Sequence, residues 1–109
     1  MTSFNAEMNS MLDHHGAAND GFVVVALYKF VSLDDIDGLR QTLQQLCDKN
    51  NILGTILLAE EGINGTIAAP RDGMTQCLNW LEADGRFDQL SLKFSFIPDQ
   101  PFLRMKVRP

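Results

Sequence analysis

The sequence has few of the residues that usually build a catalytic or metal centre. Its only histidines are His14 and His15, and its only cysteines are Cys47 and Cys77, which form no CxxC pair. Within the part of the chain predicted to fold, this excludes a Ser-His-Asp or Cys-His catalytic arrangement, and we expect no metal site. Each cysteine lies in a helix-like apolar pattern, so we expect buried reduced thiols, with a disulfide as the alternative.

Long apolar runs and an excess of basic charge are also missing. No stretch approaches the roughly 18 apolar residues that a membrane span needs, and no secretory signal pattern opens the chain. We therefore expect a cytoplasmic protein with no membrane partner. The net charge of −5 gives no general attraction to nucleic acid, so a polyanionic partner must be held by a local patch.

The composition is that of one soluble globular domain: 109 residues, of which 45% are hydrophobic and 21% charged. Residues 1–21 are rich in Asn, Ser, Ala, Met and Asp without a sustained hydrophobic period, which predicts a flexible leader. We expect the folded domain over residues 22–98 and a basic segment over residues 99–109.

Hydrophobic patterns predict four strands and two helices within residues 22–98. An apolar run from Phe22 predicts a central strand, and alternation from Leu90 to Phe96 predicts a half-buried one. A capping box at Ser32 and Asp35 opens the first helix, and Gly85 is expected in the left-handed position that ends the second. The two middle strands are expected at 52–59 and 66–69.

The resulting order is β-α-β-β-α-β, which predicts an α+β fold of the ferredoxin-like or acylphosphatase-like class. Its sheet would be antiparallel, with both helices on one face. The first strand would be central, and its side chains on the helix-free face would stay partly exposed unless the leader, another domain or a partner covers them.

A glycine-rich motif lies between the two middle strands and contains Glu61, Gly62, Asn64, Gly65 and Thr66. It predicts a hairpin turn, with Asn64-Gly65 suited to a type I′ turn, although Gly62 could instead form a bulge or a wider loop. A functional alternative is a loop whose small residues let a ligand or partner approach, with Glu61 and Asn64 as hydrogen-bonding groups.

The C-terminal segment is basic. Arg104, Lys106 and Arg108 occupy alternate positions, so an extended backbone would project them to one side. Together with Lys93 they outweigh Asp99, the only acidic residue after position 88. These four cations are candidates for binding phosphates, and a solvated stretch leading into a following domain is the alternative.

The chain resembles the rhodanese-like tRNA uridine hydroxylase family. The resemblance covers residues 22–109 and is most specific in the glycine-rich motif. It is carried by these stretches: Tyr28-Lys29-Phe30, Gly54-Thr55-Ile56, Leu58-Ala59-Glu60-Glu61-Gly62-Ile63-Asn64-Gly65-Thr66, Lys93-Phe94-Ser95 and Phe102-Leu103-Arg104-Met105-Lys106-Val107.

The resemblance implies a ferredoxin-like N-terminal domain that precedes a rhodanese-like domain carrying the active cysteine. It implies that the whole protein uses oxygen to hydroxylate carbon five of the tRNA wobble uridine. The present chain would then be a non-catalytic fragment, and neither Cys47 nor Cys77 would have the catalytic role. The expected partners are tRNA, through the full-length protein, and the chain's own C-terminal rhodanese-like domain. The sequence identifies no cofactor.

Two other functions share the same order of elements. An acylphosphatase-like hydrolase needs an arginine in the loop after the first strand, but this chain has Val31-Ser32-Leu33 there and no arginine before Arg40. A small-molecule-sensing or oligomerising module is supported by fold analogy alone.

Overall fold

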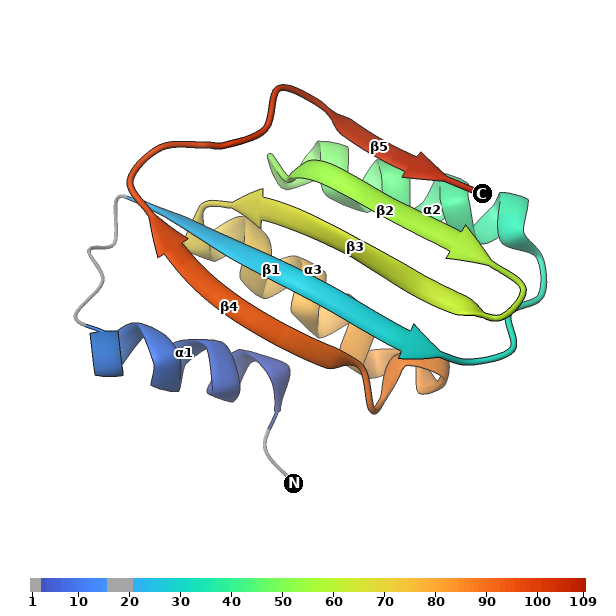
Figure 1. The fold of residues 1–109 in the computed structure, drawn as a ribbon, viewed down its shortest axis with the longest axis horizontal. Coiled ribbons are helices and arrows are strands. Elements are labelled where there is room, and N and C mark those ends of the chain that lie inside the picture. Colours follow the sequence, from blue (N-terminus) through green and yellow to red (C-terminus); the bar gives the residue numbers. More distant parts are fainter. Residues whose placement is uncertain (1–2, 16–20) are drawn as a thin grey trace.

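A five-stranded sheet with helices on one face forms the protein (Figure 1). The computed structural model describes residues 3–15 and 21–109. The elements are α1 (Phe4–His15), β1 (Phe22–Phe30), α2 (Ile36–Lys49), β2 (Leu53–Ala59), β3 (Gly62–Ala69), α3 (Arg71–Ala83), η1 (Gly85–Phe87), β4 (Ser91–Ile97) and β5 (Met105–Arg108).

The strand order is β4-β1-β3-β2-β5, so β1 is an interior strand paired on both edges, as the sequence predicts. β1 pairs antiparallel with β3 and β4, and β2 pairs antiparallel with β3. This confirms the ferredoxin-like, acylphosphatase-like fold. The sheet is mixed rather than purely antiparallel, because the added strand β5 runs parallel to β2.

β5 corrects the prediction that residues 99–109 lie outside the domain. The N–H of Gly54 donates to the carbonyl of Arg104 over 2.9 Å, which joins the segment to β2 just before β5 begins. The N–H of Val107 donates to Oε1 of Gln44 on α2 over 3.1 Å. Val107 is buried, whereas Lys106 and Arg108 are exposed. The basic segment is therefore an edge strand, held by the sheet on one side and by a helix below.

α1 corrects the prediction of a flexible leader for residues 4–15. Phe4, Met8 and Leu12, spaced by four, form one buried stripe that packs in the hydrophobic core. The side-chain amide of Asn5 donates to Asn79 on α3 over 2.6 Å. α1 thus extends the helix layer beside α3 and leaves the opposite face of the sheet uncovered (Figure 1). Residues 1–2 and 16–20 of the predicted leader lie outside the described residues.

Two predicted helix boundaries differ from the structure. The N-cap of α2 is Asp35, whose side chain accepts from the N–H of Gly38 over 3.2 Å, and Ser32 lies outside the helix. Gly85 does not take a left-handed conformation; it opens η1, where Asp84 caps Arg86. In both places an aspartate caps a helix start: Asp35 takes the place predicted for Ser32, and Asp84 caps η1 where only a helix end was predicted.

The core is apolar. Its helix side is formed by Leu39, Leu43 and Cys47 of α2 and by Met74, Cys77, Leu78 and Leu81 of α3. No polar or charged side chain is buried among the described residues. None of the helices in the described ranges has the length and apolar character that crossing a membrane requires.

Candidate functional site

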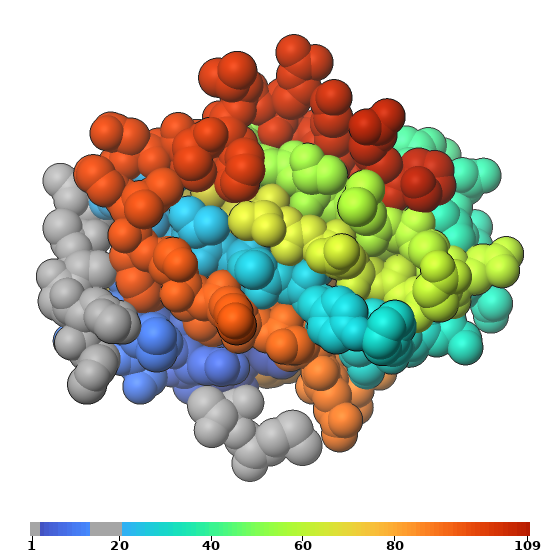
Figure 2. Space-filling view, viewed as in Figure 1, coloured from blue at the N-terminus to red at the C-terminus, as the bar shows by residue number. Residues whose placement is uncertain are grey.

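The helix-free face of the sheet, which is the face seen in Figure 2, is the candidate site. Large apolar side chains are exposed on it beside cations. The register of the strands places every second residue there. From β4 to β5, one row across the face is Ser91, Tyr28, Asn64, Leu57 and Arg108, and the neighbouring row is Lys93, Ala26, Thr66, Thr55 and Lys106.

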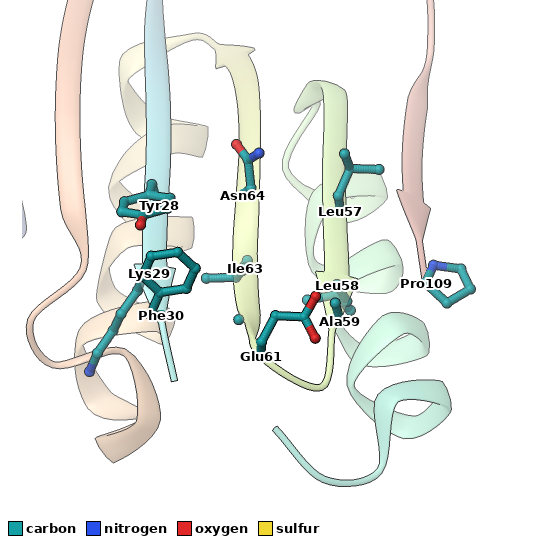
Figure 3. A pocket seen from close by; sticks show the side chains of 11 residues that line it. Tyr28, Lys29, Phe30, Leu57, Leu58, Ala59, Glu61, Ile63, Asn64 and Pro109 are labelled. Carbon is teal, nitrogen blue, oxygen red and sulfur yellow. The ribbon is translucent and has the colours of Figure 1, made fainter. Parts of the chain in front are cut away.

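A trough of about 470 Å³ lies at the hairpin end of this face (Figure 3). On one side stand Tyr28 and Phe30 of β1, and on the other stands Leu57 of β2. Between them β3 contributes Gly62, Ile63 and Asn64. Of these only Gly62 and Asn64 face the helix-free side, so the surface is lower there. Glu61 and Pro109 also line the trough.

Tyr28 and Phe30 form an aromatic pair that the sequence did not identify as a site. Their ring centroids are 5.1 Å apart at 74°, an edge-to-face contact. Tyr28 is 45% exposed and Phe30 is 75% exposed, in line with the partial exposure expected for the first strand on the helix-free face. Their spacing of two residues at the end of the predicted strand was the available signal, because it places both rings on one face.

The prediction of a type I′ turn at Asn64-Gly65 in the glycine-rich motif was wrong. The turn is formed by Glu60 and Glu61, while Asn64 and Gly65 lie inside β3. Gly62 has φ 156°, and a Cβ atom there would clash with the carbonyl oxygen of Lys29.

The two glycines of the motif serve the packing of the strands. A Cβ atom at Gly65 would clash with the carbonyl oxygen of Thr55 on β2, just as a Cβ atom at Gly62 would clash with that of Lys29 on β1. Both therefore let backbones of the same sheet approach closely. Asn64 and Thr66 point to the helix-free face, and Glu61 lies at the rim of the trough. A binding role for Glu61, Asn64 and Thr66 stays a prediction.

The four predicted phosphate-binding cations do not form one cluster. Lys106 and Arg108 lie on β5 and Arg104 just before it, whereas Lys93 lies on β4 at the other edge of the sheet. Four interstrand spacings separate the edges, or about 19 Å. Lys93 and Lys106 nevertheless share a face and a row, with Ala26, Thr66 and Thr55 between them.

Acidic residues are excluded from the sheet. The chain has 14 Asp and Glu residues, but none of them lies in β1 to β5. Those within the described residues lie in the helices, turns and connections. Lys29, on the helix side of β1, is paired with Asp88 over 3.1 Å. Apart from Glu61 at the hairpin end, the helix-free face is thus lined by cations and neutral groups in a chain of net charge −5.

The loop between β1 and α2 has the wrong chemistry for a phosphate cradle. The N–H groups of Val31 and Leu33 donate to the carbonyls of Glu61 and Glu60 over 3.0 and 2.9 Å. Such a cradle needs N–H groups that point at the ligand. Asp34 and Asp35 also place negative charge beside this loop.

The buried and paired titratable groups are structural. Cys47 and Cys77 are free thiols with no solvent exposure, so the expectation of buried reduced thiols is confirmed. A hydrogen bond with Cys47 raises the pKa of Cys77, and burial of the thiol raises it further. A hydrogen bond from Arg86, over 2.7 Å, lowers the pKa of Asp84. The described residues contain no group of three His, Cys, Asp or Glu placed to hold a metal.

A family model described as the UPF0176 acylphosphatase like domain matches residues 22–109. The match begins at β1 and includes β5, so the edge strand belongs to the shared domain. It also includes both walls of the trough and all four predicted cations.

Three solved structures share the fold. BlrB, described as a BLUF protein in its dark state, matches with a TM-score of 0.67 at 20% identity over 84% of this chain and 73% of its own. BlrP1 BLUF matches with a TM-score of 0.66 and 12% sequence identity. The match covers 81% of this chain and 63% of the BlrP1 chain, so this chain spans less than two thirds of it. An acylphosphatase from Coxiella burnetii matches with a TM-score of 0.58 and 12% sequence identity, over 81% of this chain and 94% of the acylphosphatase. At these identities the likeness shows the fold alone.

Proposed function

The chain belongs to the UPF0176 (tRNA uridine hydroxylase) family as its acylphosphatase-like N-terminal domain, and we propose that this domain is a non-catalytic tRNA-binding module. In the full-length protein it would help to hold tRNA or would orient the rhodanese-like domain, and that protein would hydroxylate carbon five of the wobble uridine. The same proposal places the protein in the cytoplasm.

One observation carries the proposal: cations lie at both edges of an exposed sheet face whose five strands contain no acidic residue. Lys93 on one edge and Lys106 and Arg108 on the other frame a surface of neutral residues. Phosphates are attracted by local charge within a Debye length of about 8–10 Å, so a favourable face can bind RNA although the whole chain is acidic.

A non-catalytic role is supported by the loop after β1. A hydrolase of the acylphosphatase type would need this loop to hold a phosphoryl group, but the N–H groups of Val31 and Leu33 are already bonded to the hairpin. We expect no hydrolysis of an acyl phosphate above the uncatalysed rate. Turnover by the purified chain would contradict this part of the proposal.

A charge-matched pair of variants tests RNA binding. Lys106→Ala/Arg108→Ala removes two positive charges from the helix-free face, and Arg40→Ala/Lys49→Ala removes two from α2 on the opposite side. We expect only the first variant to weaken tRNA binding in a mobility-shift titration. This variant should also show a weaker dependence of the tRNA-binding constant on salt. Each lost phosphate contact lowers the slope of log binding constant against log salt concentration by about 0.7–0.9. Equal effects of the two variants would show that the face has no special role.

A further inference from the structure

We infer that the trough on the helix-free face takes unpaired nucleotides, whose bases stack on Tyr28 and Phe30 while their phosphates run toward β5. The inference builds on the proposed tRNA-binding function and specifies which part of an RNA the domain contacts. It concerns the row of residues Tyr28, Asn64, Leu57 and Arg108, which lies across four adjacent strands.

The aromatic pair supplies the stacking surface. Both rings project from the central strand into solvent, and their edge-to-face contact holds each in place. Every base has a π-face, so exposed aromatic side chains on a sheet bind single-stranded nucleic acid with little sequence preference. A base inside a duplex keeps its faces covered and cannot reach such a ring.

Asn64 lies on the floor of the trough between Tyr28 and Leu57 (Figure 3). Its side-chain amide makes no hydrogen bond within the described part of the chain, and it carries both donors and an acceptor. It is thus placed to meet the edge of a base whose face lies on Tyr28. Leu57, 46% exposed, closes the opposite side with an apolar wall.

The charges set the direction of the RNA backbone. Arg108 is three interstrand spacings from Tyr28, about 14 Å, a span suited to the two or three bases that aromatic sheet platforms bind. Glu60 and Glu61 form the turn at the hairpin end and repel phosphate there. The backbone would therefore leave the trough toward Arg108 and Lys106 rather than over the hairpin.

The single tyrosine makes a direct test possible. In the 109-residue chain labelled with 3-fluorotyrosine, Tyr28 gives the only ¹⁹F resonance, and in a second sample fluorotryptophan reports on Trp80 alone. Trp80 lies on α3 in the helix layer and serves as a control for folding and for remote effects. We expect an unstructured oligouridylate to shift the Tyr28 resonance and leave that of Trp80 unchanged. A blunt RNA duplex of equal length exposes only the faces of its terminal base pairs, so it should shift the Tyr28 resonance far less.

Matched variants measure the stacking contribution. Tyr28→Leu and Phe30→Leu remove a ring but keep an apolar side chain on the strand, and Leu103→Ala removes a 95% exposed apolar side chain outside the trough. We expect each of the first two to weaken oligouridylate binding about tenfold or more. The control should bind like the parent. The Trp80 resonance checks that every variant is folded.

Three results would overturn the inference. They are parental affinity in the two leucine variants, equal affinity for oligouridylate and duplex, and a Tyr28 resonance that shifts with protein concentration without RNA, which would show that a second copy covers the face. If tRNA binding is still lost in Lys106→Ala/Arg108→Ala, the proposed function survives and only the stacking inference fails. If the parent chain binds neither tRNA nor oligouridylate, both fail together.

Discussion

Replacing Gly62 with alanine tests whether the hairpin can lie against β1 only because this residue has no side chain. Gly62 has φ 156°, and a Cβ there would clash with the backbone carbonyl of Lys29, which cannot rotate away as a side chain could. The two strands must separate at the Phe30–Gly62 pair that ends their register. A strained backbone costs about 1–3 kcal/mol, and one lost ladder hydrogen bond adds about 1 kcal/mol.

We therefore expect Gly62→Ala to lower the free energy of unfolding by about 2–4 kcal/mol, since these two costs add. For a domain of this size the melting temperature should fall by roughly 8–24 °C. Urea denaturation followed by the fluorescence of Trp80, the single tryptophan, measures the change. Gly85→Ala is the matched control, because φ is not positive there and a Cβ would have no heavy atom within 4 Å.

The control should be neutral or stabilised by up to about 1 kcal/mol, as alanine restricts the unfolded chain. Equal stability of Gly62→Ala and Gly85→Ala would refute the close approach of β3 to β1. The trough would then need another explanation, because its floor depends on that approach.

Three further predictions concern the core, the N-terminal helix and a surface ion pair. Cys47 and Cys77 are fully buried and the pKa of Cys77 is raised, so both thiols should react with a colorimetric thiol reagent only after urea is added. Met8→Ala should lower the free energy of unfolding by about 2–4 kcal/mol in urea titrations, because it empties a buried site between α1 and the sheet. Arg86 lowers the pKa of Asp84 in the folded state, so the pair stabilises the fold above the pKa of the unfolded carboxyl and loses this effect as the pH falls through the folded pKa. Asp84→Asn should thus be less stable than the parent at neutral pH, by under about 1 kcal/mol, and equal to it in acid.

The elements that could be predicted from the sequence are those with their own periodic pattern. β1, α2 and α3 each carry a buried stripe, and β4 a partly buried one, long enough to fix their type. α1 has only three core residues in a polar stretch, and its stability comes from packing against α3. β5 has only four residues and follows two prolines. It pairs with β2 because the segment before it carries the chain back to that edge of the sheet, and no local sequence pattern specifies this path.

The hairpin shows how burial overrides a local turn preference. A turn at Asn64-Gly65 would leave only residues 66–69 to pair with β1, which has nine residues. With the turn at Glu60-Glu61, β3 has eight residues and buries Ile63 and Ile67 on the helix side. The longer pairing and the two buried side chains outweigh the preference of Asn-Gly for a type I′ turn.

The candidate site was predicted in part for a related reason. Alternation correctly placed Lys106 and Arg108 on one side of an extended chain, but only the strand order shows which face of the sheet that side belongs to. Exposure of first-strand side chains on this face was expected, but Tyr28 and Phe30 were not identified as a wall. They form one because β3 places short side chains beside them. A trough between strands depends on three neighbouring strands together, so the sequence of any one strand does not reveal it.

The salt dependence of RNA binding separates stacking from charge attraction on this face. Three cations on the face, Lys93, Lys106 and Arg108, would give a log–log slope of at most about 2 for single-stranded RNA. The net charge of −5 opposes binding at low salt and is screened as salt rises, which flattens the slope further. Stacking on Tyr28 is not screened. Binding of an oligouridylate should therefore fall only gently with salt, and a slope clearly steeper than about 2 would mean that cations outside the face dominate the contact.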